Sequence, residues 1–180
     1  MQRVFVALDT PEIVADALSQ LQFGLDGARW RSPEGFHLTL QFIGDVDRHL
    51  IADIALALDG VSAPTFSLTL AGCGVFGDKK PRSLWAGVAA NDALDALQMK
   101  VESALRRTGA PLENRKFKPH VTLAYLKGVP SAAAETFCAM HGLFKCGPFP
   151  VTAFHLYESF LGGDEAHYEH LTTYPLSSSR

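Results

Sequence analysis

Residues 37–46 of the chain read HLTLQFIGDV, and residues 120–129 read HVTLAYLKGV. The two segments align without gaps, and four of their ten positions are identical. Such a match is unexpected by chance in a chain of this composition, so it indicates an internal repeat. Each copy holds a histidine and, two residues later, a threonine. These residues are His37 and Thr39 in the first copy, and His120 and Thr122 in the second.

Both copies have the β-rich, alternating pattern that predicts a strand. Side chains at positions i and i+2 of a strand point to the same face. His37 and Thr39 should therefore project together, as should His120 and Thr122. If the two halves are related by a pseudo-two-fold axis, the two pairs face each other across one cleft.

Two imidazoles in one cleft can act as general base and general acid in a single turnover. Their ordinary pKa of about 6.5 makes both protonation states available near neutral pH. The threonine hydroxyls can donate hydrogen bonds to phosphate oxygens and orient the phosphorus between the imidazoles. A single pair would more often be a core histidine bonded to its neighbour, whereas two matching copies favour catalysis. A third pattern, His170-Leu171-Thr172, lacks the following leucine and is interpreted as a coincidence of composition.

The segments around the repeat predict a mixed fold of the α+β class with antiparallel hairpins. Thr10, Asp47 and Asn91 are the expected helix N-caps. Strands are expected near 3–8, 30, 36–43, 66–70, 83–89, 120–126, 151–160 and 168–174, and helices near 11–25, 47–58, 91–109 and 131–144.

The composition is that of a globular protein. The chain has 180 residues, of which 47% are hydrophobic and 19% charged, enough for one domain or two small lobes around a core. The opening residues do not resemble a signal peptide, and no uncharged stretch approaches the length of a membrane span. The three cysteines lack metal-ligand spacing and are expected to be reduced thiols, which predicts a cytoplasmic protein. The lack of a span-length apolar stretch predicts that it has no membrane partner. They are Cys73, Cys138 and Cys146.

The charge is unevenly distributed along the chain. The formal net charge of −3 argues against a protein that coats nucleic acid through bulk charge. Residues 79–127, however, carry ten basic and four acidic residues, while the segments on either side are acidic. This positive segment is either a solvated face or a local anion-binding patch beside the second motif.

At this point the sequence resembles the 2H phosphoesterases, and more closely the RNA 2′,3′-cyclic phosphodiesterases, also called 2′-5′ RNA ligases of the LigT type. The resemblance covers about residues 2–176. It is carried by RVFVAL at 3–8, FHLTLQFIGDV at 36–46, RSLW at 82–85 and FKPHVTLAYL at 117–126, with weaker support from ESFL at 158–161.

The resemblance implies a bilobal fold, with residues 1–180 forming one domain of two interleaved lobes around a central cleft and helices outside. It implies hydrolysis of a 2′,3′-cyclic phosphate to a 2′-phosphate without metal or other cofactor, by a monomer acting on RNA ends or nucleotides. His37 would then protonate the leaving 3′ oxygen, and His120 would activate water. The family also performs a weak, ATP-independent joining reaction that makes 2′-5′ linkages.

One position departs from the family pattern. Many relatives have an arginine where this chain has Tyr125, so a cationic phosphate contact is missing or replaced. The candidates for substrate contact are basic residues near the second motif and aromatic residues that could stack on a base. For Phe42 and Phe76, core packing is the more usual role. The candidates are Arg82, Arg115, Lys118 and Lys127 for the phosphate, and Phe42, Phe76 and Tyr125 for stacking.

Three other functions remain open. The same catalytic groups could serve a 2H enzyme acting on small cyclic nucleotides or 2′-5′ oligoadenylates. The chain could also be a non-catalytic module that binds RNA ends. A metal hydrolase would need more ligands than two opposed imidazoles, and the other histidines show no ligand spacing. These histidines are His49, His141, His155 and His167.

Overall fold

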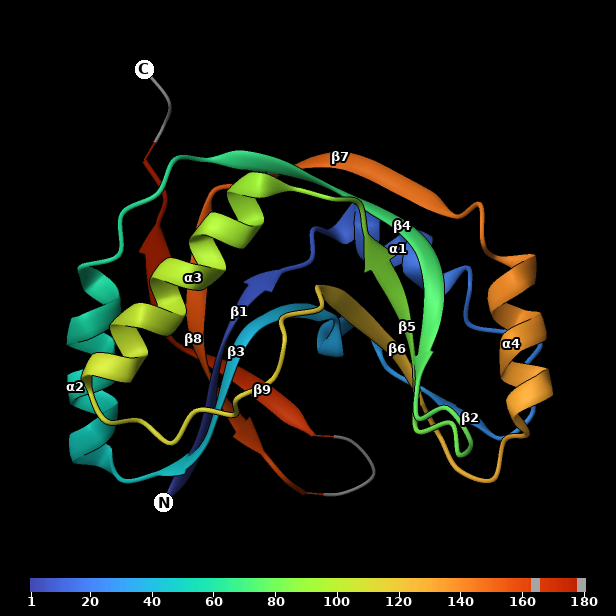
Figure 1. Cartoon of the computed structure of the whole chain (residues 1–180), viewed down its shortest axis with the longest axis horizontal. Helices are drawn as coiled ribbons and strands as arrows, with labels where there is room; N and C mark the ends of the chain where they lie inside the picture. Colours follow the sequence, from blue (N-terminus) through green and yellow to red (C-terminus); the bar gives the residue numbers. More distant parts are fainter. Residues whose placement is uncertain (163–165, 178–180) are drawn as a thin grey trace.

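Figure 1 shows the computed structural model, in which residues 1–162 and 166–177 are described. The described part has four α-helices and nine strands. The helices are α1 (Glu12–Ser19), α2 (Arg48–Asp59), α3 (Asp92–Arg107) and α4 (Ser131–Met140), and a short 3-10 turn, η1 (Pro33–Gly35), precedes β3. The strands are β1 (Gln2–Asp9), β2 (Ala28–Trp30), β3 (His37–Val46), β4 (Phe66–Phe76), β5 (Ser83–Val88), β6 (His120–Leu126), β7 (Lys145–Val151), β8 (Ala153–Phe160) and β9 (His167–Pro175).

All the strands belong to one antiparallel sheet. Its order is β7-β4-β5-β6-β3-β1-β8-β9, and β2 adds to β6. The two motif strands, β3 and β6, are neighbours at the centre, where Leu38 pairs with Val121. The predicted α+β class is confirmed. Strands β3 and β6 lie next to each other in the middle of the sheet (Figure 1), where the two halves of the sheet meet.

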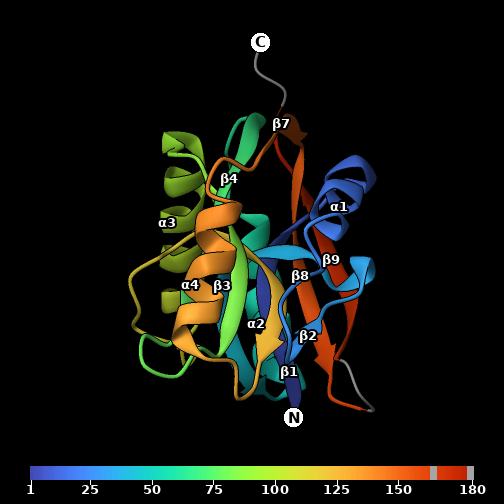
Figure 2. The ribbon, with the colours of Figure 1, turned by 90° about the vertical axis from the view of Figure 1, so that its right-hand side faces the viewer.

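The sheet has two halves, β7-β4-β5-β6 and β3-β1-β8-β9, and two of the helices pack against the half that does not precede them in the chain. Helix α3 follows β5 in the chain but lies against α2 and β3, and α1 follows β1 but contacts β7. Figure 1 shows α2 and α3 together at one end of the molecule and α4 at the other, where α4 contacts β4. In the turned view of Figure 2, α4 lies nearest the viewer and the central strands run behind it. Each half therefore supplies a helix that covers part of the other.

Helices α2 and α3 begin with a side-chain cap, whereas α1 and α4 each begin after a proline without one. The side chain of Asp47 accepts hydrogen bonds from the backbone N–H groups of His49 and Leu50, and Asn91 accepts one from Leu94. Both predicted caps are confirmed. The cap at Thr10 is wrong, because α1 begins after Pro11 with no side-chain cap.

The main difference from the predicted elements is β7, which the sequence analysis missed. This strand contains Pro148 and Pro150, and proline is unfavourable inside a sheet because it cannot donate to the ladder. Strand β7 lies at the edge of the sheet and pairs only with β4, which is where proline is tolerated. Helices α1 and α4 also end earlier than expected, at Ser19 and Met140.

The core is continuous beneath the sheet, and Phe154 illustrates its packing. This side chain is fully buried and stacks on Tyr174 with ring centroids 4.9 Å apart. We expect Phe154→Ala to lower the free energy of unfolding by about 3–5 kcal/mol, measured by urea denaturation. The control Leu143→Ala removes a side chain that is 98% exposed and should change stability by less than about 0.5 kcal/mol. Equal losses in the two variants would contradict this packing.

Two further predictions concern the cysteines and the membrane. The three cysteines are free thiols, as expected. Across residues 1–162 and 166–177, no helix has the length and apolar character needed to cross a membrane.

Candidate functional site

The motif histidines and threonines lie side by side on neighbouring strands. Because Leu38 pairs with Val121, the antiparallel register places each motif histidine opposite the threonine of the other strand. Leu38 and Val121 are buried, and the alternation of a strand sends the four motif side chains to the opposite face. His37 and His120 are thus diagonal neighbours, a relationship that spans about 7–8 Å. We call His37, Thr39, His120 and Thr122 the tetrad.

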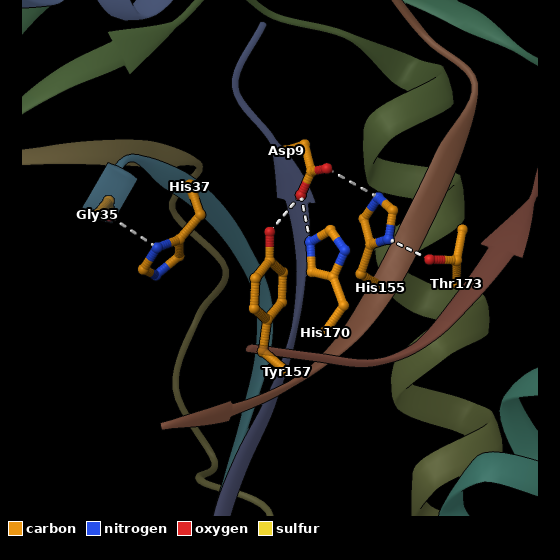
Figure 3. Close-up of polar contacts among 7 residues, drawn as sticks. All are labelled: Asp9, Gly35, His37, His155, Tyr157, His170 and Thr173. Carbon is orange, nitrogen blue, oxygen red and sulfur yellow. Dashed lines mark hydrogen bonds and ion pairs between the residues drawn. The ribbon is translucent and has the colours of Figure 1, made fainter. Parts of the chain in front are cut away.

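Both tetrad histidines are oriented by the same local contact. Nδ1 of His37 lies 2.9 Å from the carbonyl oxygen of Gly35, as Figure 3 shows, and Nδ1 of His120 lies 2.7 Å from that of Lys118. A carbonyl oxygen only accepts, so Nδ1 carries the proton in each ring. Nε2 is then the atom that gains or loses a proton, which is what general acid–base chemistry requires.

His37 is held among aromatic rings. The ring centroids of Phe5 and Tyr168 both lie 4.9 Å from that of His37. Burial in this setting, together with the nearby positive charge of Arg31, lowers the pKa of His37 to about 4. In the empty site the ring is therefore neutral at pH 7.

His120 has a similar but less buried environment. Phe76 approaches its ring edge-on, with centroids 4.9 Å apart, and Trp85 lies 6.0 Å away. The ammonium group of Lys118 lies 4.6 Å from the centroid of Trp85 and 5.6 Å from that of Phe76. Burial lowers the pKa of His120, and the Lys118 charge acts in the same direction. Each histidine is thus flanked by aromatic rings and a cation.

The tetrad lies where two cavities meet. A cavity of about 760 Å³ is lined by His120 and Thr39 among others, and a cavity of about 280 Å³ by His37, Thr39 and Thr122. The two share Thr39, Phe42 and Tyr125. Six of the seven predicted contact residues line the larger cavity: Phe42, Phe76, Arg82, Arg115, Lys118 and Tyr125.

Lys127 is the exception among the predicted contacts. It is exposed, follows the end of β6 and lines neither cavity. Phe42 and Phe76 are only partly buried and reach the cavity wall, so they are not simply core residues.

The positive segment of the sequence contributes to the larger cavity. Four of its basic residues line the wall, and one of these, Arg115, also forms an ion pair with Glu113 at 3.1 Å. In Figure 1 the loop after α3 returns across the central strands towards β6. This placement favours the anion-binding patch over the solvated face. The four residues are Arg82, Arg115, Lys116 and Lys118.

Sequence reasoning missed the groups around His37, above all Arg31. Arg31 is 5% exposed and lines the smaller cavity. Arg31 lies in the acidic segment that precedes residue 79, so the charge pattern of the sequence did not indicate it as a phosphate contact. The available signal was its position directly before the first motif, beside a short strand. Pairing of β2 with β6 brings it next to Tyr125.

A second polar cluster lies beside His37 (Figure 3). Nε2 of His170 lies 3.0 Å from Oδ1 of Asp9, Nε2 of His155 lies 3.4 Å from Oδ2, and the Tyr157 hydroxyl donates to the same carboxylate. The Thr173 hydroxyl contacts Nδ1 of His155. Burial, with the Asp9 charge, raises the pKa of Tyr157.

This cluster corrects one expectation about metal ligands. His155 showed no ligand spacing in the sequence, yet the potential ligand atoms of Asp9, His155 and His170 lie within 4.8 Å of one another. The two imidazoles stack with ring centroids 4.2 Å apart, and the Nε2 atom of each lies within 3.4 Å of the Asp9 carboxylate. The cluster is a hydrogen-bonded network, and its His170 lines neither tetrad cavity.

Comparisons with known proteins show which family and which chains this protein is similar to. Residues 10–161 match the family model of the 2′-5′ RNA ligase superfamily. A Thermotoga maritima protein named RNA 2′,3′-cyclic phosphodiesterase is 38% identical over 135 residues, which cover 71% of this chain and 72% of that protein. A Geobacillus stearothermophilus protein of the same name is 40% identical over 112 residues, which cover 61% of this chain and only 34% of the relative. The fold matches E. coli LigT complexed with 3′-AMP at a TM-score of 0.78 and 26% identity, covering 98% of this chain and 99% of that one.

Proposed function

Since the chain belongs to the 2′-5′ RNA ligase superfamily, we propose that it hydrolyses RNA ends bearing a 2′,3′-cyclic phosphate to 2′-phosphates. The observation that carries the proposal is the tetrad, in which His37 and His120 share one face and each has Nδ1 bound to a backbone carbonyl. The relatives named RNA 2′,3′-cyclic phosphodiesterase support the choice of substrate.

The tetrad supports a single in-line displacement at phosphorus. The hydroxyls of Thr39 and Thr122 donate to the non-bridging oxygens and hold the phosphorus between the two rings. Nε2 of His120 takes a proton from water as the water oxygen bonds to phosphorus. The bond from phosphorus to the 3′ oxygen breaks, and the Nε2 proton of His37 passes to that oxygen. The product is a 2′-phosphate with a free 3′-hydroxyl.

Binding of the substrate favours the protonated form of His37, which is the general acid. In the empty site, burial and the Arg31 charge hold the pKa of His37 at about 4. A bound phosphate diester carries a negative charge, which favours the imidazolium and offsets the effect of Arg31. We expect the pKa of His37 to rise on binding, which increases the fraction of protonated rings that can donate to the leaving group.

The larger cavity is suited to the nucleotides next to the cyclic end. Its basic wall can contact backbone phosphates, and the half-buried rings of Phe42 and Phe76 can stack on bases, an interaction worth about 1–3 kcal/mol per base. One chain provides both histidines, which supports action as a monomer. Three free thiols support a reducing compartment such as the cytoplasm. The weak ATP-independent joining reaction uses the same chemistry in reverse and stays a prediction.

The test is a panel of substrates. We expect the protein to convert an RNA oligomer ending in a 2′,3′-cyclic phosphate to the 2′-phosphate, identified by chromatography against 2′- and 3′-phosphate standards. Because the tetrad acts by proton transfer, the rate should be unchanged in EDTA. Turnover of free cyclic nucleotides or 2′-5′ oligoadenylates without turnover of the oligomer would establish the alternative enzyme. Binding of RNA ends without any turnover would establish the non-catalytic module.

A further inference from the structure

The side chain of Arg31 is built into the wall of the smaller cavity. Its Nη1 donates to the hydroxyl of Tyr125 at 2.9 Å, and its Cζ lies 5.4 Å from the ring centroid of Tyr125 and 5.1 Å from that of Tyr168. An added Cβ at Gly35 would lie 2.6 Å from Nη2. Gly35 therefore leaves the space that the guanidinium occupies, while its carbonyl orients His37.

This buried charge has no counter-ion in the part of the chain that the structure describes. No described carboxylate forms an ion pair with Arg31, and its Nε and Nη2 are buried without a hydrogen-bond partner. A buried charge that is unpaired is costly, and a buried polar group without a partner costs about 1–3 kcal/mol. Such an arrangement is expected where an anionic ligand completes it.

The anion that fits is defined by the other walls of the same cavity. Arg31 shares this cavity of about 280 Å³ with His37, Thr39 and Thr122. We propose that Arg31 is the phosphate-binding cation of the site, and that the phosphate of the substrate is its counter-ion. The inference rests on the proposed function for the identity of the ligand.

The strand pairing explains how Arg31 reaches this place. Strand β2 runs beside β6, with Arg29 opposite Tyr125 and Trp30 opposite Ala124. The backbone N–H of Arg31 then donates to the carbonyl of Leu123 at 2.9 Å. The guanidinium thus comes from the strand next to Tyr125, and the Tyr125 hydroxyl holds it in position. A positive charge placed at position 125 would lie in the same cavity.

The test uses inorganic phosphate as the probe, because its binding does not depend on turnover. We expect Arg31→Met to weaken phosphate binding ~10–100-fold by calorimetry. Without phosphate this variant should melt at the same temperature as the unmodified protein or higher, because it removes an unpaired buried charge. Phosphate should raise the melting temperature of the unmodified protein but not that of the variant. The pKa of His37, followed by NMR, should rise in the variant.

Two variants and a control refine the result. Arg31→Lys should retain part of the affinity as a point charge. Adding Tyr125→Arg to Arg31→Met should restore phosphate binding. Arg48→Ala removes an exposed charge of the same sign that lines neither tetrad cavity and should bind phosphate normally. If Arg31→Met binds phosphate with the same affinity as the unmodified protein, the inference is overturned, whether or not the variant is destabilised.

The same data separate this inference from the proposed function. If the unmodified protein hydrolyses the cyclic end and Arg31→Met does so at the same rate with normal phosphate binding, only the role of Arg31 is wrong. If phosphate binding depends on Arg31 but no cyclic phosphate is hydrolysed, the inference stands and the proposed function fails.

Discussion

Replacing His120 by alanine should lower kcat on an RNA 2′,3′-cyclic phosphate by about 10²–10⁴-fold, which is the usual contribution of one proton-transfer group. His37→Ala should cause a loss of similar size. Because both groups act in one displacement, the double variant should be little worse than either single one. Initial rates measured with substrate in excess of KM test these expectations.

A matched control comes from another histidine. His49 is exposed at the start of α2 and lines neither tetrad cavity, so His49→Ala should keep the full rate. Circular dichroism of all the variants checks that they remain folded. Full turnover in either His37→Ala or His120→Ala would eliminate the two-histidine mechanism.

The second large effect is on the pH dependence of kcat/KM, which reports the free enzyme. The pKa of His37 is about 4 and that of His120 is also below 6.5, because both rings are buried near positive charges. Above pH 6.5 the protonated fraction of both rings in the free enzyme falls as the pH rises, and with it the supply of a general acid. We therefore expect kcat/KM to fall roughly tenfold per pH unit from pH 6.5 upwards. On the acid side, it should fall again once both rings are protonated.

The complex should behave differently from the free enzyme. The charge of the bound phosphate raises the pKa of His37, so the basic limb of kcat should lie at higher pH than that of kcat/KM. Arg31→Met should move the acid limb of kcat/KM to higher pH, because it removes a charge that lowers the pKa of His37, the lower of the two. A kcat/KM profile that is flat or rising between pH 6.5 and 8.5 would show that the histidines do not carry the reaction.

The sequence predicted the tetrad because its information is local. Because side chains in a strand alternate with a period of two residues, His37 lies on the same face as Thr39, and His120 on the same face as Thr122, whichever strands are neighbours. What could not be read locally is the register between distant strands. The pairs were expected on opposing walls of a cleft, whereas Leu38 pairs with Val121 and brings them onto neighbouring strands.

Tyr125 was predicted as a contact residue, but a small irregularity in β6 is what turns its side chain towards the site. Simple alternation would place it on the face opposite Thr122. The pairing of β5 with β6 shifts between Leu84 and Trp85, so Leu123 is an extra residue and the alternation reverses after it. Tyr125 then reaches both tetrad cavities. The importance of Arg31 depends on this same long-range arrangement, so charge counting could not find it.

The packing of α3 across the two halves of the sheet has a consequence for the spacing between His37 and His120. The motif strands pair only at Leu38 and Val121, and such a narrow junction between the two halves could by itself bend like a hinge. Helix α3, however, spans the junction by packing its buried face, including Leu94, Leu97 and Val101, against elements of both halves. Widening the gap between the imidazoles would expose that face to water. We therefore expect the packing of α3 to keep the two imidazoles at nearly the same spacing with and without RNA.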